Sequence, residues 1–346
     1  MKIAIITRSD DRSPKVLAQG LEAMLKAAGA GCTIFYETGA LIRLQSLTQA
    51  LKFPVTVPKR IYSKLKFFKR DKNFLRELRN YDAVIVSECT PNGFWRGYYA
   101  IEKLKRRIKK PILFYEVYYL GNAPTQLERL KQEGEPGPER YDWHLAVTDV
   151  TEIRTSAGKG WTRVGLDLSY TGLRPLPKKE FLVLVDFVQP GYEHYRQEQL
   201  EVLDKAGIAY VALEGSYTME AIRALYRRAS VLLIQFPEAF GLPIAECLAC
   251  GAYIFTPDSS WAMSWRLDEQ PGVHEKGKLA PCFVEYADAP DLKNKLLDLQ
   301  AHYDLEKTPA TVFTQFVEYY PHFYYGERDV VKSLLKMIEN GLFEKN

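Results

Sequence analysis

The stretch over residues 230–261 constrains the fold of this chain more than any other, because strand and helix signals alternate within it. It reads SVLLIQFPEAFGLPIAECLACGAYIFTPDSSW. The apolar run 231–234 is typical of a strand buried on both faces. The proline that opens 243–250 suits a first helical position, and Gly251 suits the left-handed end of that helix. A second strand is expected over 252–256, so the stretch predicts one βαβ unit of a parallel sheet.

Two glutamates belong to this unit, one in its loop and one on its helix. Glu238 follows the first strand, and Glu246 falls in the first turn of the expected helix. The amino end of a helix presents unpaired N–H groups and the positive end of its dipole, which attract an anion such as a diphosphate. Both carboxylates are therefore expected to face one crevice beside an anion site. A surface unit with two solvated glutamates is the alternative.

The segment from Glu238 to Glu246, EAFGLPIAE, resembles the E-x(7)-E motif of retaining, nucleotide-sugar-dependent glycosyltransferases with the GT-B fold, above all those of family 4. The continuation over 247–251, CLACG, is similar to the small-residue helix and glycine that follow the motif there. The resemblance covers residues 205–261 well, and the rest of the chain by architecture alone. It implies an α/β fold with two Rossmann-like domains that face each other across a cleft, the GT-B architecture.

The resemblance also implies roles for the residues of this unit. Glu238 would be the catalytic residue and hold hydroxyls of the donor sugar, while Glu246 would hold the ribose hydroxyls, since a carboxylate can accept several hydrogen bonds. The amides of Phe240, Gly241 and Leu242 would line the pocket for the sugar and the phosphates. Oriented N–H groups and cations can stabilise a leaving diphosphate, so neither a metal nor another cofactor is expected.

Two further positions belong to the nucleotide-sugar site that the resemblance implies. Tyr217, together with Met219, is a candidate for packing on the nucleotide base; a capped helix start with an exposed tyrosine is the alternative. Glu116 stands where the family tends to have a histidine near the donor sugar. A solvated acid at a strand end is the alternative there.

The chain departs from the family where the diphosphate is normally held. The family usually has a Gly-Arg pair, and then a lysine, after the first strand of its second domain. Here residues 183–196 read VLVDFVQPGYEHYR, and Asp186 lies near the place where a cation is expected. Arg196 is therefore the expected substitute, with His194 as a second candidate. A basic residue of the first domain is the remaining alternative.

Alternating strand and helix signals divide the chain into two α/β domains. Residues 1–167 are expected to form an acceptor-side domain, and residues 168–320 a nucleotide-sugar-binding domain. Residues 321–346 are expected to pack back on the first domain, and helices over 311–320 and 327–340 suit that role. The other segments expected to be strands lie at 2–7, 32–36, 83–87, 112–116, 145–148, 181–187 and 208–213, and those expected to be helices at 15–28, 193–206, 218–228 and 289–303.

Composition excludes several classes of protein. No apolar run in the 346 residues approaches the roughly 20 that cross a bilayer. The amino terminus becomes charged too soon for a signal peptide, so a cytoplasmic location is expected. Cys247 and Cys250 form a C-x-x-C without a second pair to complete a zinc site, which predicts buried packing instead.

Positive charge is concentrated in the first half of the chain. Residues 59–79 hold nine Lys or Arg against two acids, and residues 103–110 hold six basic residues and no acid. Because apolar and aromatic side chains interleave with the basic ones in 59–79, one interpretation is peripheral docking on the anionic inner face of the cell membrane. A solvated helix face is the alternative. Nucleic-acid binding accounts for the charge but not for the central motif, so no nucleic-acid partner is expected.

Taken with these features, the resemblance implies a retaining, metal-independent glycosyltransferase of the hexosyltransferase kind. It would move a sugar from a UDP-sugar, or a GDP-sugar as second choice, to a glycan or lipid-linked acceptor in polysaccharide or glycoconjugate biosynthesis. One alternative is an enzyme of the same fold, such as a sugar-nucleotide epimerase or a phosphorylase. Another is a nucleotide-sugar-binding protein without turnover, which the missing Gly-Arg pair motivates.

Overall fold

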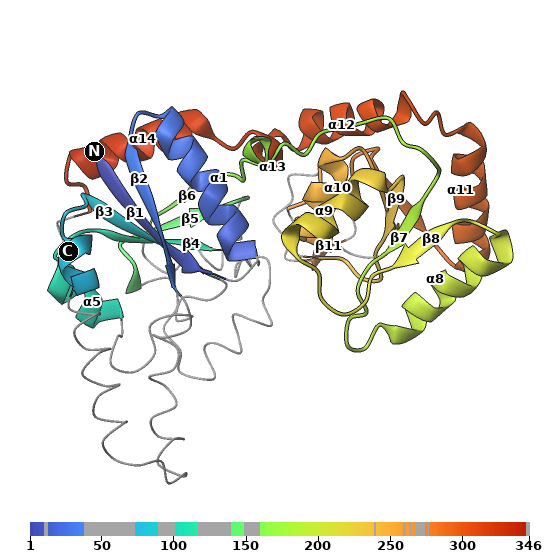
Figure 1. The fold of residues 1–346 in the computed structure, drawn as a ribbon, viewed down its shortest axis with the longest axis horizontal. Helices are drawn as coiled ribbons and strands as arrows, with labels where there is room; N and C mark the ends of the chain where they lie inside the picture. The colour runs from blue at the N-terminus through green and yellow to red at the C-terminus, as the bar shows by residue number, and fades with distance from the viewer. Residues whose placement is uncertain are drawn as a thin grey trace, which may run out of the picture. The chain divides into compact units, whose positions relative to one another are not determined.

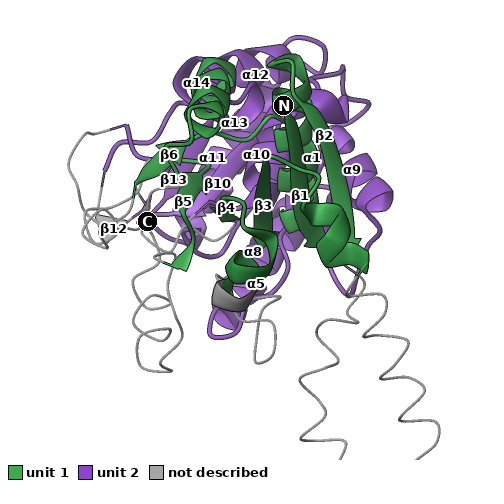
Figure 2. Ribbon diagram, turned by 90° about the vertical axis from the view of Figure 1, so that its left-hand side faces the viewer, with its two compact units in different colours: residues 1–148, 152–167, 327–346 green, residues 149–151, 168–326 purple. Residues whose placement is uncertain are grey.

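The chain divides into two compact units, each with its own parallel sheet (Figure 2). Unit 1 comprises Met1–Thr148, Glu152–Asp167 and Glu327–Asn346, and unit 2 comprises Asp149–Thr151 and Leu168–Gly326. The computed structural model describes residues 1–9, 13–37, 73–88, 101–116, 140–148, 160–238, 240–258, 261–262, 264–267, 274–275 and 277–343.

Unit 1 contains a six-stranded sheet whose paired strands all run parallel (Figure 1). Its strands are β1 (Lys2–Arg8), β2 (Gly31–Glu37), β3 (Ala83–Glu88), β4 (Ile112–Glu116), β5 (Trp143–Ala146) and β6 (Trp161–Arg163). The order is β2-β1-β3-β4-β5-β6, so the direction of winding reverses between β1 and β3. Ile6 is in register with Val86, which places Arg8 and Glu88 level at the carboxyl ends of these two strands.

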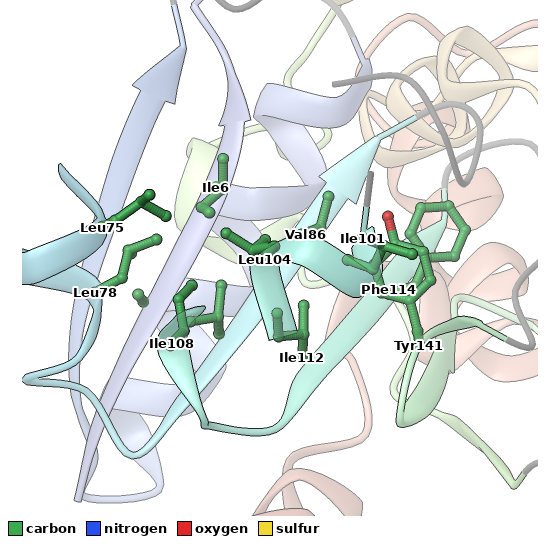
Figure 3. Packing of buried hydrophobic residues seen from close by; sticks show 12 residues of the cluster. Ile6, Leu75, Leu78, Val86, Ile101, Leu104, Ile108, Ile112, Phe114 and Tyr141 are labelled. Carbon is green, nitrogen blue, oxygen red and sulfur yellow. The ribbon is translucent and has the colours of Figure 1, made fainter. Parts of the chain in front are cut away.

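The core of unit 1 lies between its sheet and two helical segments, α5 (Ile101–Ile108) and residues 73–78 (Figure 3). Its buried members are Ala4, Ile6, Leu75, Leu78, Val84, Val86, Ile101, Leu104, Ile108, Ile112, Phe114 and Tyr141. A second helix pair belongs to the same unit: α1 (Ser13–Ala27) packs on β1 and β2 and contacts α14 (Arg328–Glu339). The central strands are therefore buried on both faces, which accounts for their continuous apolar runs.

Unit 2 repeats this topology with a five-stranded parallel sheet. Its strands are β7 (Val183–Val185), β8 (Tyr210–Ala212), β9 (Val231–Leu233), β10 (Tyr253–Pro257) and β13 (Phe283–Tyr286), in the order β13-β10-β9-β7-β8. Winding reverses between β7 and β9. At such a switch point the loops that follow the two neighbouring strands lead to opposite faces of the sheet. This opens a crevice at the carboxyl ends of the strands, where doubly wound proteins bind ligands.

The helices of unit 2 are α8 (Glu193–Ala206), α9 (Met219–Arg228), α10 (Leu242–Ala249), α11 (Ala289–His302), α12 (Thr308–Tyr319) and the short α13 (Pro321–Tyr324). Two further two-residue strands, β11 (Trp261–Ala262) and β12 (His274–Glu275), pair antiparallel outside the main sheet. Most expected elements are present within a few residues of their predicted bounds. β6 and β13 were not predicted; both are edge strands, and neither has a continuous apolar run.

The units divide between Asp167 and Leu168, the position at which the sequence places a domain boundary. The chain returns to unit 1 at Glu327, where the second terminal helix was expected to begin, whereas residues 321–326, which include α13, stay in unit 2 and do not return as expected. Phe323 of α13 is fully buried there, with its ring centroid 4.7 Å from that of Trp265. The expectation that residues 311–320 return to the first domain is also wrong, since α12 stays in unit 2 and packs on α10.

Of the two basic segments, residues 59–72 lie outside the part of the chain that the structure describes. In the parts of these segments that the structure describes, residues 73–79 and α5 each carry exposed arginines. Arg79 donates from Nε to the backbone carbonyl of Arg107 over 2.8 Å, which joins the two segments. Within the described ranges, no helix combines the length and the apolar character needed to cross a bilayer.

Candidate functional site

The loop between β9 and α10 turns into the helix at a glycine. Gly241 is the N-cap of α10, with φ 71° and ψ 88°, a left-handed conformation that favours glycine. Glycine supplies no side-chain oxygen, so no side chain of the N-cap meets the first amides of α10. At the other end Gly251 is also left-handed, with φ 78°, as the sequence predicts.

The carboxyl group of Glu238 lies against this glycine. A Cβ atom on residue 241 would sit 2.6 Å from Oε2 of Glu238 and 2.8 Å from Cδ1 of Ile244, so any larger residue would force one of these side-chain ends to shift. The Glu238 side chain is half-buried. Burial, together with the negative charge of Asp186 as the smaller cause, raises the pKa of Glu238 to about 8. The structure therefore brings Glu238 and Gly241 together at the start of the helix.

Glu246 is buried, with an exposed fraction of 2%. Because α10 begins at Leu242, Glu246 lies in the second turn and not in the first, where it was expected. Its Oε1 accepts two hydrogen bonds from Arg223 of α9, one from Nε at 2.9 Å and one from Nη2 at 2.5 Å. Burial raises the pKa of Glu246, and the charge of Arg223 opposes that rise.

Tyr226 of α9 is a buried phenol, 3% exposed. Burial raises the pKa of Tyr226 well above its usual value, and the negative forms of Cys247, Glu246, Asp186 and Glu238 add to the rise, in that order. All four groups therefore act on one buried phenol.

Asp186 directly follows β7 and is 3% exposed. Its Oδ1 has no hydrogen-bond partner within the described part of the chain. Burial raises the pKa of Asp186 to about 6, while the amide of Phe187 and the charge of Arg196 lower it. A buried carboxylate oxygen without a partner is costly, so this group calls for a physical explanation.

Arg196, the expected diphosphate ligand, has a buried guanidinium that binds backbone. Its Nε donates to the carbonyl of Asp186 and its Nη2 donates to the carbonyl of Leu213, both at 3.1 Å. These bonds hold together the chain just beyond β7 and β8. Nη2 of Arg196 also lies 3.6 Å from Oε1 of Glu214. Binding of a diphosphate by Arg196 stays a prediction.

Phe240 contributes its ring to the core of unit 2. The ring stacks on Trp265 with centroids 6.2 Å apart and planes 3° apart, and its centroid lies 5.0 Å from that of Phe323. The carbonyl of Phe240 accepts from Nε1 of Trp265 at 2.6 Å. This aromatic packing fixes one end of the loop, and Leu242 is buried beside it. The proposed contacts of the backbone amides with a ligand stay a prediction.

Tyr217 belongs to unit 2 and directly precedes Thr218, the capping residue of α9. Tyr217 is 37% exposed and meets Phe187 edge-on, with centroids 5.9 Å apart. Thr218 caps α9 by accepting from the amide of Ala221, so the capped helix start with an exposed tyrosine is present. Contact of Tyr217 with a base stays a prediction.

Glu116 ends β4 and so belongs to unit 1, whereas the other predicted site residues belong to unit 2. It is fully buried, and its Oε2 lies 3.1 Å from Nε2 of His144. The alternative that Glu116 is a solvated strand-end acid is therefore wrong. At the switch point of the same sheet, Arg8 and the buried Glu88 form an ion pair at 2.6 Å.

Sequence reasoning missed Arg223, Tyr226 and His144. Arg223 and Tyr226 lie three residues apart on α9, on the side that meets α10, but the pattern does not separate Arg223 from the exposed arginine Arg228 of the same helix.

Cys247 and Cys250 are buried free thiols, as predicted. In the described ranges no group of three or more His, Cys, Asp or Glu side chains is placed to hold a metal ion.

Searches of protein-family models and of curated protein sequences find no match to this chain. Solved structures match along its whole length. HepE from Anabaena in complex with UDP-glucose is 14% identical, with 99% of each chain covered and a TM-score of 0.50. An alpha-glucosyltransferase in complex with UDP and a 13-mer DNA is 12% identical, with 98% of this chain and 99% of that chain covered and a TM-score of 0.57.

The catalytic domain of starch synthase IV from Arabidopsis thaliana, bound to ADP and acarbose, is 9% identical, with 99% of each chain covered and a TM-score of 0.55. At such identities the likeness concerns the fold alone. It confirms the predicted fold class, because the two parallel α/β sheets of this chain match those of its neighbours. The chain therefore has the GT-B fold, with two Rossmann-like domains.

Proposed function

We propose that this chain is a glycosyltransferase that moves a sugar from a nucleoside-diphosphate sugar to an acceptor. One observation carries the proposal: the switch point of unit 2 combines a left-handed glycine N-cap, a loop carboxyl pressed against that glycine, and a second carboxylate on the helix that follows. The GT-B fold of its neighbours supports the proposal. Two of them were crystallised with UDP-glucose or UDP, and a third with ADP.

Each part of the site has a proposed task. The first amides of α10, together with the positive end of its dipole, receive the diphosphate. Glu238 meets the donor sugar from the loop. Arg223 holds one oxygen of Glu246 and so fixes its orientation, which leaves the second oxygen as the proposed acceptor for a ribose hydroxyl.

The proposed donor is a UDP-sugar, with a GDP-sugar as the alternative, and the proposed acceptor is a glycan or lipid-linked glycan precursor. Transfer is proposed to retain the anomeric configuration and to need no metal ion, because helix amides can stabilise charge on the leaving diphosphate. Chelation by EDTA is then expected to leave turnover unchanged. Proton NMR of the first-formed product would report its anomeric configuration.

The decisive experiment measures release of nucleoside diphosphate from a panel of UDP-, GDP- and ADP-sugars, with and without oligosaccharide acceptors. Slow hydrolysis without acceptor, abolished in Glu238→Ala, is the expected result. Binding is checked separately by thermal shift, since a ligand at 100 times its Kd stabilises the fold by about 2.7 kcal/mol. Absence of both binding and release for every donor would contradict the proposal.

A second candidate function is a nucleotide-sugar-binding protein without turnover. Asp186 occupies the place where the resemblance implies a cation, and the guanidinium of Arg196 is hydrogen-bonded to backbone carbonyls. Both observations remove positive charge from the expected diphosphate site. Tight donor binding without release of diphosphate would favour this candidate. Conversion of the donor to an isomer would indicate an epimerase, and dependence on inorganic phosphate a phosphorylase.

Docking on an anionic membrane surface is proposed as a second property of unit 1. Four arginines of the two basic segments support this proposal, because they are exposed to solvent: Arg76, Arg79, Arg106 and Arg107. Arg79 and Arg107 are brought together by a hydrogen bond from Nε to a backbone carbonyl. A lipid-linked acceptor would give such docking a purpose, because it would bring the enzyme to its substrate.

A further inference from the structure

The peptide bond between Phe240 and Gly241, which leads into α10, is held from one side by an indole. Nε1 of Trp265 donates to the carbonyl oxygen of Phe240 at 2.6 Å. The rings of these two residues also stack, with planes 3° apart, and both residues are buried. The carbonyl of Phe240 therefore points toward Trp265, into the aromatic core of unit 2.

The direction of this carbonyl fixes the direction of the next amide. The peptide is trans, and a trans peptide directs its C=O and its N–H to opposite sides. Because the carbonyl of Phe240 points toward Trp265, the N–H of Gly241 points away from it. Gly241 is the N-cap of α10, so its N–H directly precedes the first amides of the helix, which have no partner within the helix itself.

The local backbone alone does not select this orientation. Gly241 has a φ of 71°, and turning the peptide over by half a turn would bring φ into the negative range that every residue adopts. Glycine accepts both signs of φ about equally well. The choice between the two orientations is therefore left to contacts outside the turn, and the hydrogen bond from Trp265 is such a contact.

Trp265 is itself held in place from several sides. The hydroxyl of Tyr320 donates to the carbonyl of Trp265 at 2.5 Å and accepts from the amide of Ala280 at 3.2 Å. The indole ring is fully buried, and its centroid lies 4.7 Å from that of Phe323. A donor fixed in this way keeps its direction when a ligand binds, so the group that it orients is preorganised.

We propose that Trp265 is a positioning residue for the diphosphate: through the carbonyl of Phe240 it directs the amide of Gly241 toward a phosphate oxygen of the sugar nucleotide. This inference rests on the proposed function and deepens it, because it adds one specific donor to the amides of α10. Such a donor matters at this site, since the guanidinium of Arg196 is hydrogen-bonded to backbone carbonyls. Oriented amides can stabilise phosphate charge in place of a cation.

Trp261 offers a matched control for a test of this role. It is fully buried like Trp265, and both rings pack against Phe283, with centroids 5.5 Å and 5.3 Å away. Within the described part of the chain, Nε1 of Trp261 has no hydrogen-bond partner. Trp261→Phe therefore removes ring volume and an unused donor, whereas Trp265→Phe removes ring volume and the hydrogen bond to Phe240.

The first test needs no substrate. Crystal structures of the two variants show the orientation of the peptide between residues 240 and 241. In Trp265→Phe we expect the peptide turned over, with a negative φ at Gly241, and in Trp261→Phe we expect φ to stay positive. An unchanged peptide in Trp265→Phe would show that the indole N–H does not set its direction, and would overturn the proposal.

The second test measures affinity by calorimetry, in variants shown to be folded by circular dichroism. The ligands are the nucleoside diphosphate that the donor screen selects, UDP or GDP, and its nucleoside. Relative to Trp261→Phe, Trp265→Phe should bind the diphosphate at least about tenfold more weakly, because a hydrogen bond to a charged group is lost. The nucleoside, which carries no phosphate, should show no such difference. A merely structural role of Trp265 would weaken both ligands alike.

The third test uses the wild type and so decides even if Trp265→Phe does not fold. Amide NMR of protein with labelled glycine follows the signal of Gly241, which is assigned by its loss in Gly241→Ala. We expect the amide proton of Gly241 to move downfield as the nucleoside diphosphate binds and to stay in place when the nucleoside binds. A Gly241 signal that does not move at saturating diphosphate would overturn the proposal.

The outcomes separate the inference from the function beneath it. If neither UDP nor GDP binds, the proposed function fails, whereas the crystal structures still decide whether Trp265 directs the peptide. If the diphosphate binds with equal affinity to Trp265→Phe and Trp261→Phe, the inference is overturned and the proposed function stands.

Discussion

Arg223 and Glu246 form a buried ion pair between α9 and α10, in which a single carboxylate oxygen accepts from Nε at 2.9 Å and from Nη2 at 2.5 Å. The exposed fractions of the two side chains are 14% and 3%. A charge pair so far removed from water contributes less to stability than its geometry suggests, because both groups lose hydration. Its clearer effect is on position: it fixes the carboxylate that we propose meets the ribose.

Replacing Arg223 by Met should destabilise unit 2 by about 3 kcal/mol, because Glu246 would remain buried without its partner. Methionine keeps the apolar stem and removes only the charge and the donors. The control is Arg228→Met on the same helix, whose ion pair with Glu180 is about half exposed and should cost less than about 1 kcal/mol. Urea unfolding measures both. Equal losses in the two variants would show that the Arg223 pair behaves as a surface contact.

Replacing Glu246 by Ala should weaken binding of the nucleoside diphosphate by about 1.5–3 kcal/mol, because a charged acceptor for the ribose hydroxyls is lost. Calorimetry with UDP, in protein shown to be folded by circular dichroism, measures this change. Glu238→Ala is the matched comparison, since it removes a carboxyl group that we assign to the sugar, and it should leave UDP affinity nearly unchanged. Unaltered UDP affinity in Glu246→Ala would remove this residue from the proposed site.

Local signals predicted the β9–α10 unit well. The apolar run before the loop, the proline near the helix start and Gly251 after it are each read from neighbouring residues, and α10 begins one residue from its predicted start. The one-residue shift explains why Glu246 moved to the second turn. The contacts that decide its chemistry were not predictable in this way. Arg223 meets Glu246 from another helix, 23 residues earlier.

The same limit applies to Asp186 and Glu116. The sequence places both at strand ends, where a side chain is either solvated or buried according to what packs over it. Asp186 is 3% exposed, and Glu116 is fully buried beside His144. Burial of a strand end depends on loops and helices that are distant in sequence, so periodicity carries no information about it.

Replacing Gly241 by Ala should lower both stability and donor turnover. The left-handed backbone costs an alanine about 1–2 kcal/mol, and the new Cβ would press on Oε2 of Glu238 at 2.6 Å. Gly207→Ala is the control, because its φ of 65° is also left-handed and no atom lies within 4 Å of the new Cβ. We expect similar strain in both variants but loss of turnover in Gly241→Ala alone. Full turnover in Gly241→Ala would contradict the role of this contact.

The buried acids predict how stability changes with pH. A carboxyl group whose pKa is raised by folding contributes stability below its unfolded pKa, and this contribution is lost as pH rises through the folded value. For Asp186 that window runs from its usual 3.8 to about 6. This pKa difference means that ionisation of Asp186 destabilises the folded protein by at most about 3 kcal/mol. The gain in stability from Asp186→Asn is about 1 kcal/mol smaller, because a buried asparagine keeps an unpaired polar group.

Asp186→Asn should therefore be more stable than the wild type by about 1–2 kcal/mol above pH 6, and should show no gain below about pH 4. Urea unfolding at a series of pH values measures the difference between the two proteins. Asp204→Asn, at an exposed position, should show no such pH dependence. A difference that is constant across the series would mean that the Asp186 carboxyl titrates normally.

The last prediction concerns the exposed arginines of unit 1. Arg106 and Arg107 lie near the carboxyl end of α5, and Arg107 is joined to Arg79, which directly follows the helical residues 73–78 that carry Arg76. If this surface docks on anionic lipid, each arginine contributes about 1 kcal/mol, and ionic strength weakens the attraction. The double change Arg106→Glu and Arg107→Glu should then lower co-sedimentation with phosphatidylserine vesicles at least tenfold.

Lys205→Glu with Lys307→Glu is the matched control, since it makes the same charge change at exposed positions of unit 2. Equal binding to neutral and anionic vesicles, or equal loss in both double variants, would show that net charge and not this surface governs the interaction.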